Sequence, residues 1–181
     1  DSLINSTANS TDIYFTQHPY HFYEVFTSTD NTVFSIENQV NENTFFFEWN
    51  NSTSKSVYLK TSDACGNTKL SDTLPTISLN GVAQNTVNKL NWITLSSKSQ
   101  EIFRNETTIN SSTENYNDTD INCGETYDYF VQEKQDNSTI KSNSVNLKAI
   151  STNTPAPLKD FYTSVVNNKI TFNWTNNSVK T

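Results

Sequence analysis

The sequence predicts an all-β protein made of tandem antiparallel β-sandwiches, and three observations support this prediction. Aromatic residues recur in short alternating runs bounded by Asn, Asp, Ser and Thr, the pattern of strands and turns. No stretch shows the apolar period of a helix. The runs are spaced to give roughly seven short strands per ~80–90 residues, which is the density of strands in a sandwich.

Composition argues against both a disordered chain and a nucleic-acid-binding protein. Asn, Ser and Thr make up 75 of the 181 residues, but 11 Phe, 8 Tyr and 3 Trp supply the side chains that disordered chains lack. The formal net charge is -7 and no Lys/Arg run occurs, so nucleic acid is not an expected partner. No apolar run approaches the ~18–20 residues of a membrane span, so no span is expected in this segment.

Internal repeats divide the chain into three units. Trp92 and Trp174 end two similar runs and lie 82 residues apart, and Pro75 and Pro157 have the same offset. A second offset, of 71 residues, relates Leu70-Ser71-Asp72 to Lys141-Ser142-Asn143. We therefore expect units at residues 1–74, 75–153 and 154–181, with the first N-terminally incomplete or divergent and the last limited to the start of a unit.

The first unit carries six expected strands and no tryptophan in its first one. Tyr14 or Phe15 would fill the volume that Trp92 fills in the second unit. Phe46 is the aromatic residue most exposed on its strand, because Phe45 and Phe47 take the opposite face. The expected strands are Ser10–Thr16, His21–Thr27, Val33–Ile36, Asn43–Asn50, Ser56–Ala64 and Lys69–Leu74.

The second unit is the complete copy, and its core is the easiest to predict. Tyr127, Tyr129 and Val131 alternate along one strand, so one face of that strand should be buried together with Trp92. Trp174 should hold the same place in the third unit. The expected strands are Thr76–Val82, Lys89–Leu95, Gln100–Asn105, Glu114–Thr119, Thr126–Gln135 and Lys141–Ile150.

These residues resemble fibronectin type III modules, which are immunoglobulin-like sandwiches. Trp92 lies where that family keeps the core tryptophan of its strand B, and Gly124-Glu125-Thr126-Tyr127-Asp128-Tyr129-Phe130-Val131 is similar to the family's entry into strand F. The resemblance implies that the Tyr127 phenol bonds a backbone group a few residues upstream, as in a tyrosine corner. Residues 155–174 resemble strands A and B of a following module.

A narrower resemblance is to the tandem modules of large surface proteins of gliding Bacteroidota. The junction Asp63-Ala64-Cys65-Gly66-Asn67, followed by Leu70-Ser71-Asp72, carries it together with the turn before Gly124. The resemblance implies type IX secretion, a gliding-motility-associated sorting domain beyond this segment, and an extracellular or bacterial cell-surface location. It also implies O-linked glycans in the pattern Asp-Ser/Thr-apolar, which occurs at Ser2 and Thr73.

Two clusters could be interpreted as metal sites, but each has a simpler explanation. His18 and His21 lack a third ligand at a recognisable distance, so a surface role is favoured over a metal. Asp118, Asp120 and Asn122 offer calcium-type oxygens, but such residues at turns usually bond their own backbone. No metal is expected.

Cys65 and Cys123 are expected to be unpaired thiols. The strand assignment places them at the far poles of two different sandwiches, beyond the roughly 4.4–6.8 Å between Cα atoms that a disulfide needs. A bridge to another chain or module is the alternative. In the related proteins the first cysteine often pairs with one early in its own strand F, where this chain has Ser56.

No catalytic motif is present, so we expect neither enzymatic activity nor a cofactor. The predicted function is a stalk, spacer or adhesin shaft of tandem sandwiches. Its partners would be neighbouring modules of the same chain, and cell-surface proteins, secretion proteins or glycans. The alternative is a carbohydrate-binding module, with Tyr20, Phe22 or Phe46 stacking on sugar rings, or an accessory module of a secreted hydrolase.

Overall fold

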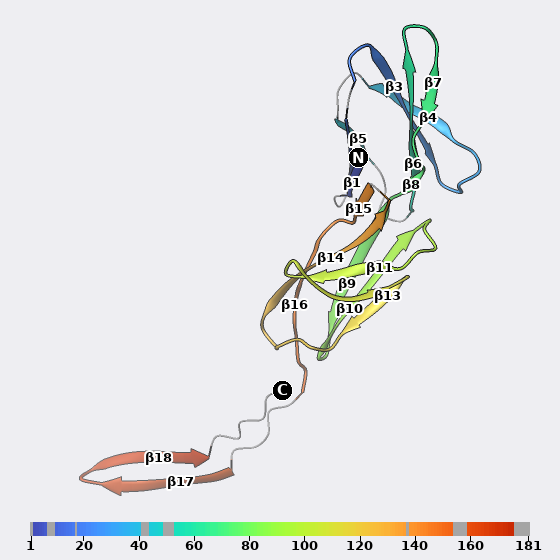
Figure 1. The fold of residues 1–181 in the computed structure, drawn as a ribbon. Coiled ribbons are helices and arrows are strands. Elements are labelled where there is room, and N and C mark those ends of the chain that lie inside the picture. The colour runs from blue at the N-terminus through green and yellow to red at the C-terminus, as the bar shows by residue number, and fades with distance from the viewer. Residues whose placement is uncertain are drawn as a thin grey trace.

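The computed structural model describes residues 2–6, 10–16, 18–40, 44–48, 53–136, 138–153 and 159–175, and the regular elements in these ranges are all β-strands (Figure 1). The predicted fold class is confirmed. Among the described residues, no helix is long and apolar enough to cross a membrane.

The middle unit is a sandwich of two antiparallel sheets. One sheet has the order β13-β10-β9, and the other has the order β12-β11-β14, with β15 and β16 both pairing with β14. The strands of the first sheet are Ile77–Gln84 (β9), Val87–Thr94 (β10) and Asn115–Asp118 (β13). Those of the second are Gln100–Arg104 (β11), Thr107–Ser112 (β12), Thr126–Gln135 (β14), Ser138–Lys141 (β15) and Val145–Lys148 (β16).

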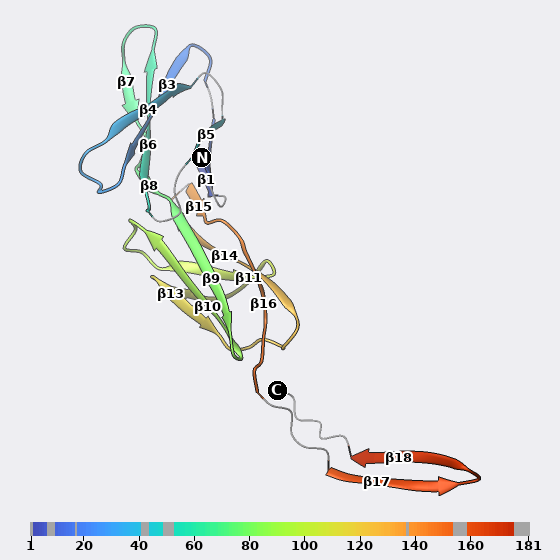
Figure 2. The ribbon, with the colours of Figure 1, turned by 180° about the vertical axis from the view of Figure 1, so that it is seen from behind.

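The first unit repeats this strand order element by element (Figures 1 and 2). One sheet has the order β5-β2-β1, and the other has the order β4-β3-β6, with β7 and β8 both pairing with β6. Although an incomplete unit was expected, every strand of the second sandwich has a counterpart here. The strands are Ser2–Ser6 (β1), Ser10–Phe15 (β2), His21–Ser28 (β3), Ser35–Val40 (β4), Thr44–Glu48 (β5), Ser56–Asp63 (β6), Thr68–Leu70 (β7) and Leu74–Pro75 (β8).

A shared strand joins the two sandwiches. β1 pairs antiparallel with β2 of its own unit and, on its other side, parallel with β15 of the second unit, with Ile4 opposite Ile140. One eight-stranded sheet therefore continues from the first sandwich into the second. Neither β1 nor this parallel pair was predicted, because five residues with two apolar side chains give no periodic signal.

Buried polar contacts also hold the junction. The Ser54 hydroxyl donates to the Thr76 carbonyl oxygen at 2.8 Å, and the Leu95 amide donates to the Ser54 Oγ at 3.2 Å. Ser54 is 4% exposed and Thr76 is 0% exposed. Leu74 and Pro75 still pair with β6, and Ile77 begins β9, so the chain passes from one unit to the next within two residues.

The expected strand Lys141–Ile150 is shorter in the structure, because β15 already ends at Lys141 and β16 covers only Val145–Lys148. The Ser142 amide donates to the Val131 carbonyl at 2.9 Å, but the Val131 amide is bonded by the Ser142 hydroxyl oxygen at 3.0 Å instead of a backbone carbonyl. The Ser142 hydroxyl donates in turn to the Asn143 carbonyl at 2.8 Å. A serine side chain thus replaces one ladder bond and bends the strand.

The core anchors proposed for the second sandwich are buried. Trp92 is 4% exposed, Tyr127 7%, and Tyr129 and Val131 0%. Close packing of β9 against β16 depends on Gly81, where an added Cβ would lie 3.0 Å from a Leu147 methyl carbon.

Trp174, which the sequence predicts to be a core residue of the third unit, has a side chain that is 55% exposed. Lys159–Val166 (β17) and Lys169–Thr175 (β18) pair with each other and, among the described residues, with no further strand. The register Thr163–Phe172 matches Gly81–Leu90 at the offset of 82, so the pair has the geometry of β9 and β10. Trp174 is exposed because no second sheet covers this hairpin within the described part of the chain.

Candidate functional site

Arg104 forms ion pairs with Asp118 and Asp120, two of the three residues considered above as calcium ligands. Its Nη1 lies 3.0 Å from Asp118 Oδ2 and its Nη2 lies 3.1 Å from Asp120 Oδ2, and Nη1 also donates to the Asp120 carbonyl. The Asp120 amide donates to Asp118 Oδ1 at 3.1 Å, as expected for a turn that bonds its own backbone. Asp118 is 1% exposed, so its pair with Arg104 belongs to the packed interior, whereas the Asp120 side chain is 95% exposed.

Asn122 serves the tyrosine corner. The backbone N–H of Asn122 donates to the Tyr127 hydroxyl at 2.9 Å, and that hydroxyl donates to the Glu125 carboxylate at 2.7 Å. Hydrogen bonds from the Tyr127 hydroxyl and the Asn122 side chain lower the pKa of Glu125. The backbone bond five residues upstream is the contact that the resemblance implies.

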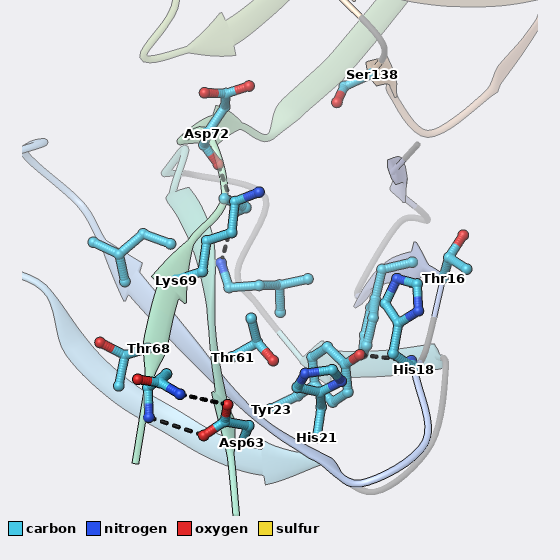
Figure 3. Close-up of a pocket in the computed structure, with 15 residues that line it drawn as sticks. Thr16, His18, His21, Tyr23, Thr61, Asp63, Thr68, Lys69, Asp72 and Ser138 are labelled. Atoms are coloured by element: carbon cyan, nitrogen blue, oxygen red, sulfur yellow. Dashed lines mark hydrogen bonds between the residues drawn. The ribbon is translucent and has the colours of Figure 1, made fainter. Parts of the chain in front are cut away.

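A groove of about 700 Å³ lies on the surface of the first sandwich. It opens beside β7, between the sheet that contains β2 and the sheet that contains β6 (Figure 3). Phe15, Tyr23, Leu59 and Leu70 provide its apolar lining. The polar residues that line it include His18, His21, Asp63, Lys69, Asp72 and, from the second sandwich, Ser138.

His18 and His21 both line this groove. Their rings meet edge to face with centroids 5.8 Å apart, and the His18 amide donates to the Tyr23 hydroxyl at 2.8 Å. No group of three His, Cys, Asp or Glu residues suited to a metal occurs in the described ranges. The two rings therefore form one wall of the groove (Figure 3).

Asp63 is fixed at the same end of the groove. It accepts hydrogen bonds from the Asn67 side chain at 2.8 Å and the Asn67 amide at 2.9 Å, and these bonds hold the pKa of its carboxyl below the ordinary value. His21 lies opposite Asp63 in the β3–β6 ladder and adds a smaller effect in the same direction. Asp63 is thus a fixed anionic group.

The two sandwiches differ at a residue that lines this groove. In the second sandwich, Asn143 Oδ1 accepts from the Leu79 amide and Asn143 Nδ2 donates to the Leu79 carbonyl, each at 2.8 Å. This side chain fastens β9 to the segment between β15 and β16. In the first sandwich the equivalent residue is Asp72, which forms no side-chain hydrogen bond to a strand backbone among the described residues.

The serine before each of these residues behaves identically in both units. The Ser71 amide donates to the Leu59 carbonyl at 2.8 Å, and the Leu59 amide donates to Ser71 Oγ at 2.9 Å, as Ser142 and Val131 do in the second unit. The repeat at the offset of 71 is visible in the sequence, but no groove was predicted from it. The replacement of Asn143 by Asp72 was the available signal, because a carboxylate cannot donate a hydrogen bond.

Tyr20, Phe22 and Thr73 are not among the residues that line the groove. Tyr20 is 88% and Phe22 59% exposed, and Phe22 alternates with Tyr23 along β3, so it faces away from the groove lining. The side chains of Phe46 in β5 and Ser2 in β1 lie outside the described residues. Thr73 is exposed between β7 and β8.

Cys65 and Cys123 are free and exposed. Cys65 lies in the turn between β6 and β7, and Cys123 lies in the loop that precedes β14. These segments lie at opposite ends of the joined sandwiches (Figure 1).

Among solved structures, chains similar to this one are found. No family model matches the chain, and no curated protein matches it. The fibronectin(III)-like modules of Clostridium thermocellum CbhA are similar over 82% of this chain and 88% of that chain, with 10% sequence identity and a TM-score of 0.28. A TM-score this low supports no argument about this chain, so the sandwich assignment rests on the strand order above.

Proposed function

We propose that this chain is a non-catalytic shaft segment of a secreted or bacterial cell-surface protein, which holds other parts of the protein at a fixed distance. The observation that carries the proposal is the parallel pair β1–β15, which makes two sandwiches share one sheet. A shared strand resists bending at the junction, whereas sandwiches joined only by a linker reorient freely. The acidic exterior, at a net charge of -7, favours solubility.

The finer parts of the proposal rest on the resemblance to Bacteroidota surface proteins. They are a type IX secretion and gliding context, glycans on Ser2 and Thr73, and partners among neighbouring modules, surface or secretion proteins and glycans. The third hairpin would be the start of a further module. In that proposal, Trp174 becomes buried when a second sheet covers β17 and β18.

A matched pair of proline variants tests the shaft. Bonded and non-bonded pairs alternate along an antiparallel ladder, and the Ser142 amide is bonded to Val131, so the Thr139 amide points away from β14 towards β1. Thr139→Pro removes a backbone N–H that points towards β1, and it leaves the hydrogen bonds between β15 and β14 in place. Thr68→Pro is the equivalent change in β7, where no second strand receives the amide among the described residues.

Small-angle X-ray scattering of the whole chain reads out the result. Thr139→Pro should broaden the distribution of interatomic distances at the long end, and Thr68→Pro should leave it as in the wild type. Equal profiles for Thr139→Pro and the wild type would show that β1–β15 pairing does not hold the sandwiches in line.

Exposed aromatic residues favour carbohydrate binding as a second candidate function, in a binding or accessory module. Tyr20 and Phe22 are largely exposed and lie two residues apart at one end of the first sandwich. Rings at such positions can stack on sugars. Glycan-array binding that is lost in Tyr20→Ala and Phe22→Ala, and kept in Tyr162→Ala of the third unit, would support this candidate. Binding to no glycan would remove it.

A further inference from the structure

The edge of β7 presents backbone groups that no strand receives in the described part of the chain. The Ser71 amide donates to the Leu59 carbonyl and the Asp63 amide donates to the Asn67 carbonyl. These two bonds show which residues of β7 direct their backbone groups towards β6. Because bonded pairs alternate along such a ladder, the amides and carbonyls of Thr68 and Leu70 point away from β6. Such an edge is a template for a further strand.

The same chain shows what occupies this edge in the second sandwich. β15 follows β14 as β7 follows β6, and Lys69, opposite Thr61, corresponds to Ile140, opposite Glu133. The outer edge of β15 carries β1 as a parallel strand, with Leu3 opposite Thr139 and Ile4 opposite Ile140. In the second sandwich, therefore, this edge pairs with an extended strand.

The groove beside β7 differs from its counterpart in charge. Ile140 is 0% exposed, whereas Lys69 is exposed and lines the groove. A lysine on an edge strand discourages indiscriminate pairing. A residue opposite Lys69 on an incoming strand would lie on the same face of the sheet, where opposite charges attract.

We propose that the β7 edge and the adjoining groove bind an extended polypeptide strand, parallel to β7, with an acidic residue opposite Lys69. The occupant is the edge strand of another sandwich of this repeat, equivalent to β1. Backbone hydrogen bonds to Thr68 and Leu70 supply the affinity, and Lys69 makes binding selective for a strand with an acidic residue at the opposite position. The β7 edge of the first sandwich would thus pair with a strand of a neighbouring sandwich, as β15 of the second sandwich pairs with β1 of the first.

Two fluorescent heptapeptides test the proposal by anisotropy titration against the whole chain. One has the sequence of residues 1–7, and the other carries Ile4→Glu, which places the acid opposite Lys69. The Ile4→Glu peptide should bind roughly two- to fivefold more tightly than the first. Lys69→Ile in the chain should reverse that order. An order that is unchanged by Lys69→Ile, or no saturable binding of either peptide, would overturn the proposal.

Proline variants locate the binding edge. Thr68→Pro removes one outward amide of β7 and should weaken peptide binding roughly two- to tenfold, whereas Thr139→Pro should not weaken it. The opposite result would mean that the peptide displaces β1 from β15, and it would refute the β7 site. Hydrogen exchange on the wild-type chain gives a readout without a variant, because bound peptide should slow exchange at Thr68 and Leu70, and unchanged exchange there would contradict the proposal.

Discussion

Asn143→Asp tests the contact that closes the second sandwich. The native amide accepts from the Leu79 amide and donates to the Leu79 carbonyl, each at 2.8 Å, and Asn143 is 5% exposed. The substitution keeps the acceptor and removes the donor. The buried Leu79 carbonyl would then face a carboxylate oxygen with no proton between them.

The expected loss of stability follows from these contacts. Leaving a buried polar group without its partner costs about 1–3 kcal/mol, and more for a charged group. We expect Asn143→Asp to lower the free energy of unfolding by about 2–4 kcal/mol at neutral pH, out of roughly 5–15 kcal/mol for a domain. Asp72→Asn, at the open counterpart in the first sandwich, should change it by less than about 0.5 kcal/mol.

The loss should depend on pH in a defined direction. Burial disfavours the charged form of the introduced carboxyl, and the protonated form can donate to the Leu79 carbonyl, so folding raises its pKa above the unfolded value of about 3.9. The destabilisation is therefore smallest below that unfolded pKa and grows as the pH rises towards the folded pKa.

Guanidinium unfolding of the whole chain, followed by Trp92 fluorescence, measures this effect. Trp49→Phe and Trp174→Phe in all variants leave Trp92 as the reporter. A loss below about 0.5 kcal/mol at neutral pH, or an equal loss at acidic and neutral pH, would refute the role given to Asn143.

Three further outcomes are expected. Trp92→Ala should cost about 3–5 kcal/mol in denaturant unfolding, and a loss below about 1 kcal/mol would show that Trp92 is not a core residue. The Thr32 and Val33 amides hold the pKa of Asp30 well below its ordinary value, so Asp30 stabilises the fold above its unfolded pKa and this contribution is lost as the pH falls through the folded pKa. Asp30→Asn should therefore flatten the acid limb of the stability curve, and an unchanged limb would contradict this. Cys65 and Cys123 should both react with a thiol reagent in the native protein, as judged by intact mass, whereas protection of either would argue against its exposure.

Most strand positions along the chain were predictable, because they depend on the short-range alternation of apolar and polar residues. Thr126–Gln135 was predicted with its observed bounds, because Tyr127, Tyr129 and Val131 keep one face buried along its length. β12 was missed because Thr107–Ser112 contains one apolar residue, Ile109, and its strand conformation comes from pairing with β11. Tertiary pairing, not local preference, decides such an edge strand.

The groove and the shared strand could not be predicted, because both depend on contacts between distant segments. β1 meets β15 across more than a hundred residues of sequence, and neither strand carries a signal for its partner. Asp72 lines the groove at the position where the second sandwich carries Asn143. Sequence comparison of the units shows the substitution, but only the fold shows that Asn143 bonds a strand.

The most direct test of the shaft uses the two native thiols. Cys65 and Cys123 lie in exposed turns at opposite ends of the joined sandwiches (Figure 1), so spin labels on them report the distance across the junction. If β1 belongs to both sandwiches, pulsed electron spin resonance should give one narrow distance distribution. A broad or multiple distribution would contradict a shared strand and would mean that the two sandwiches move independently.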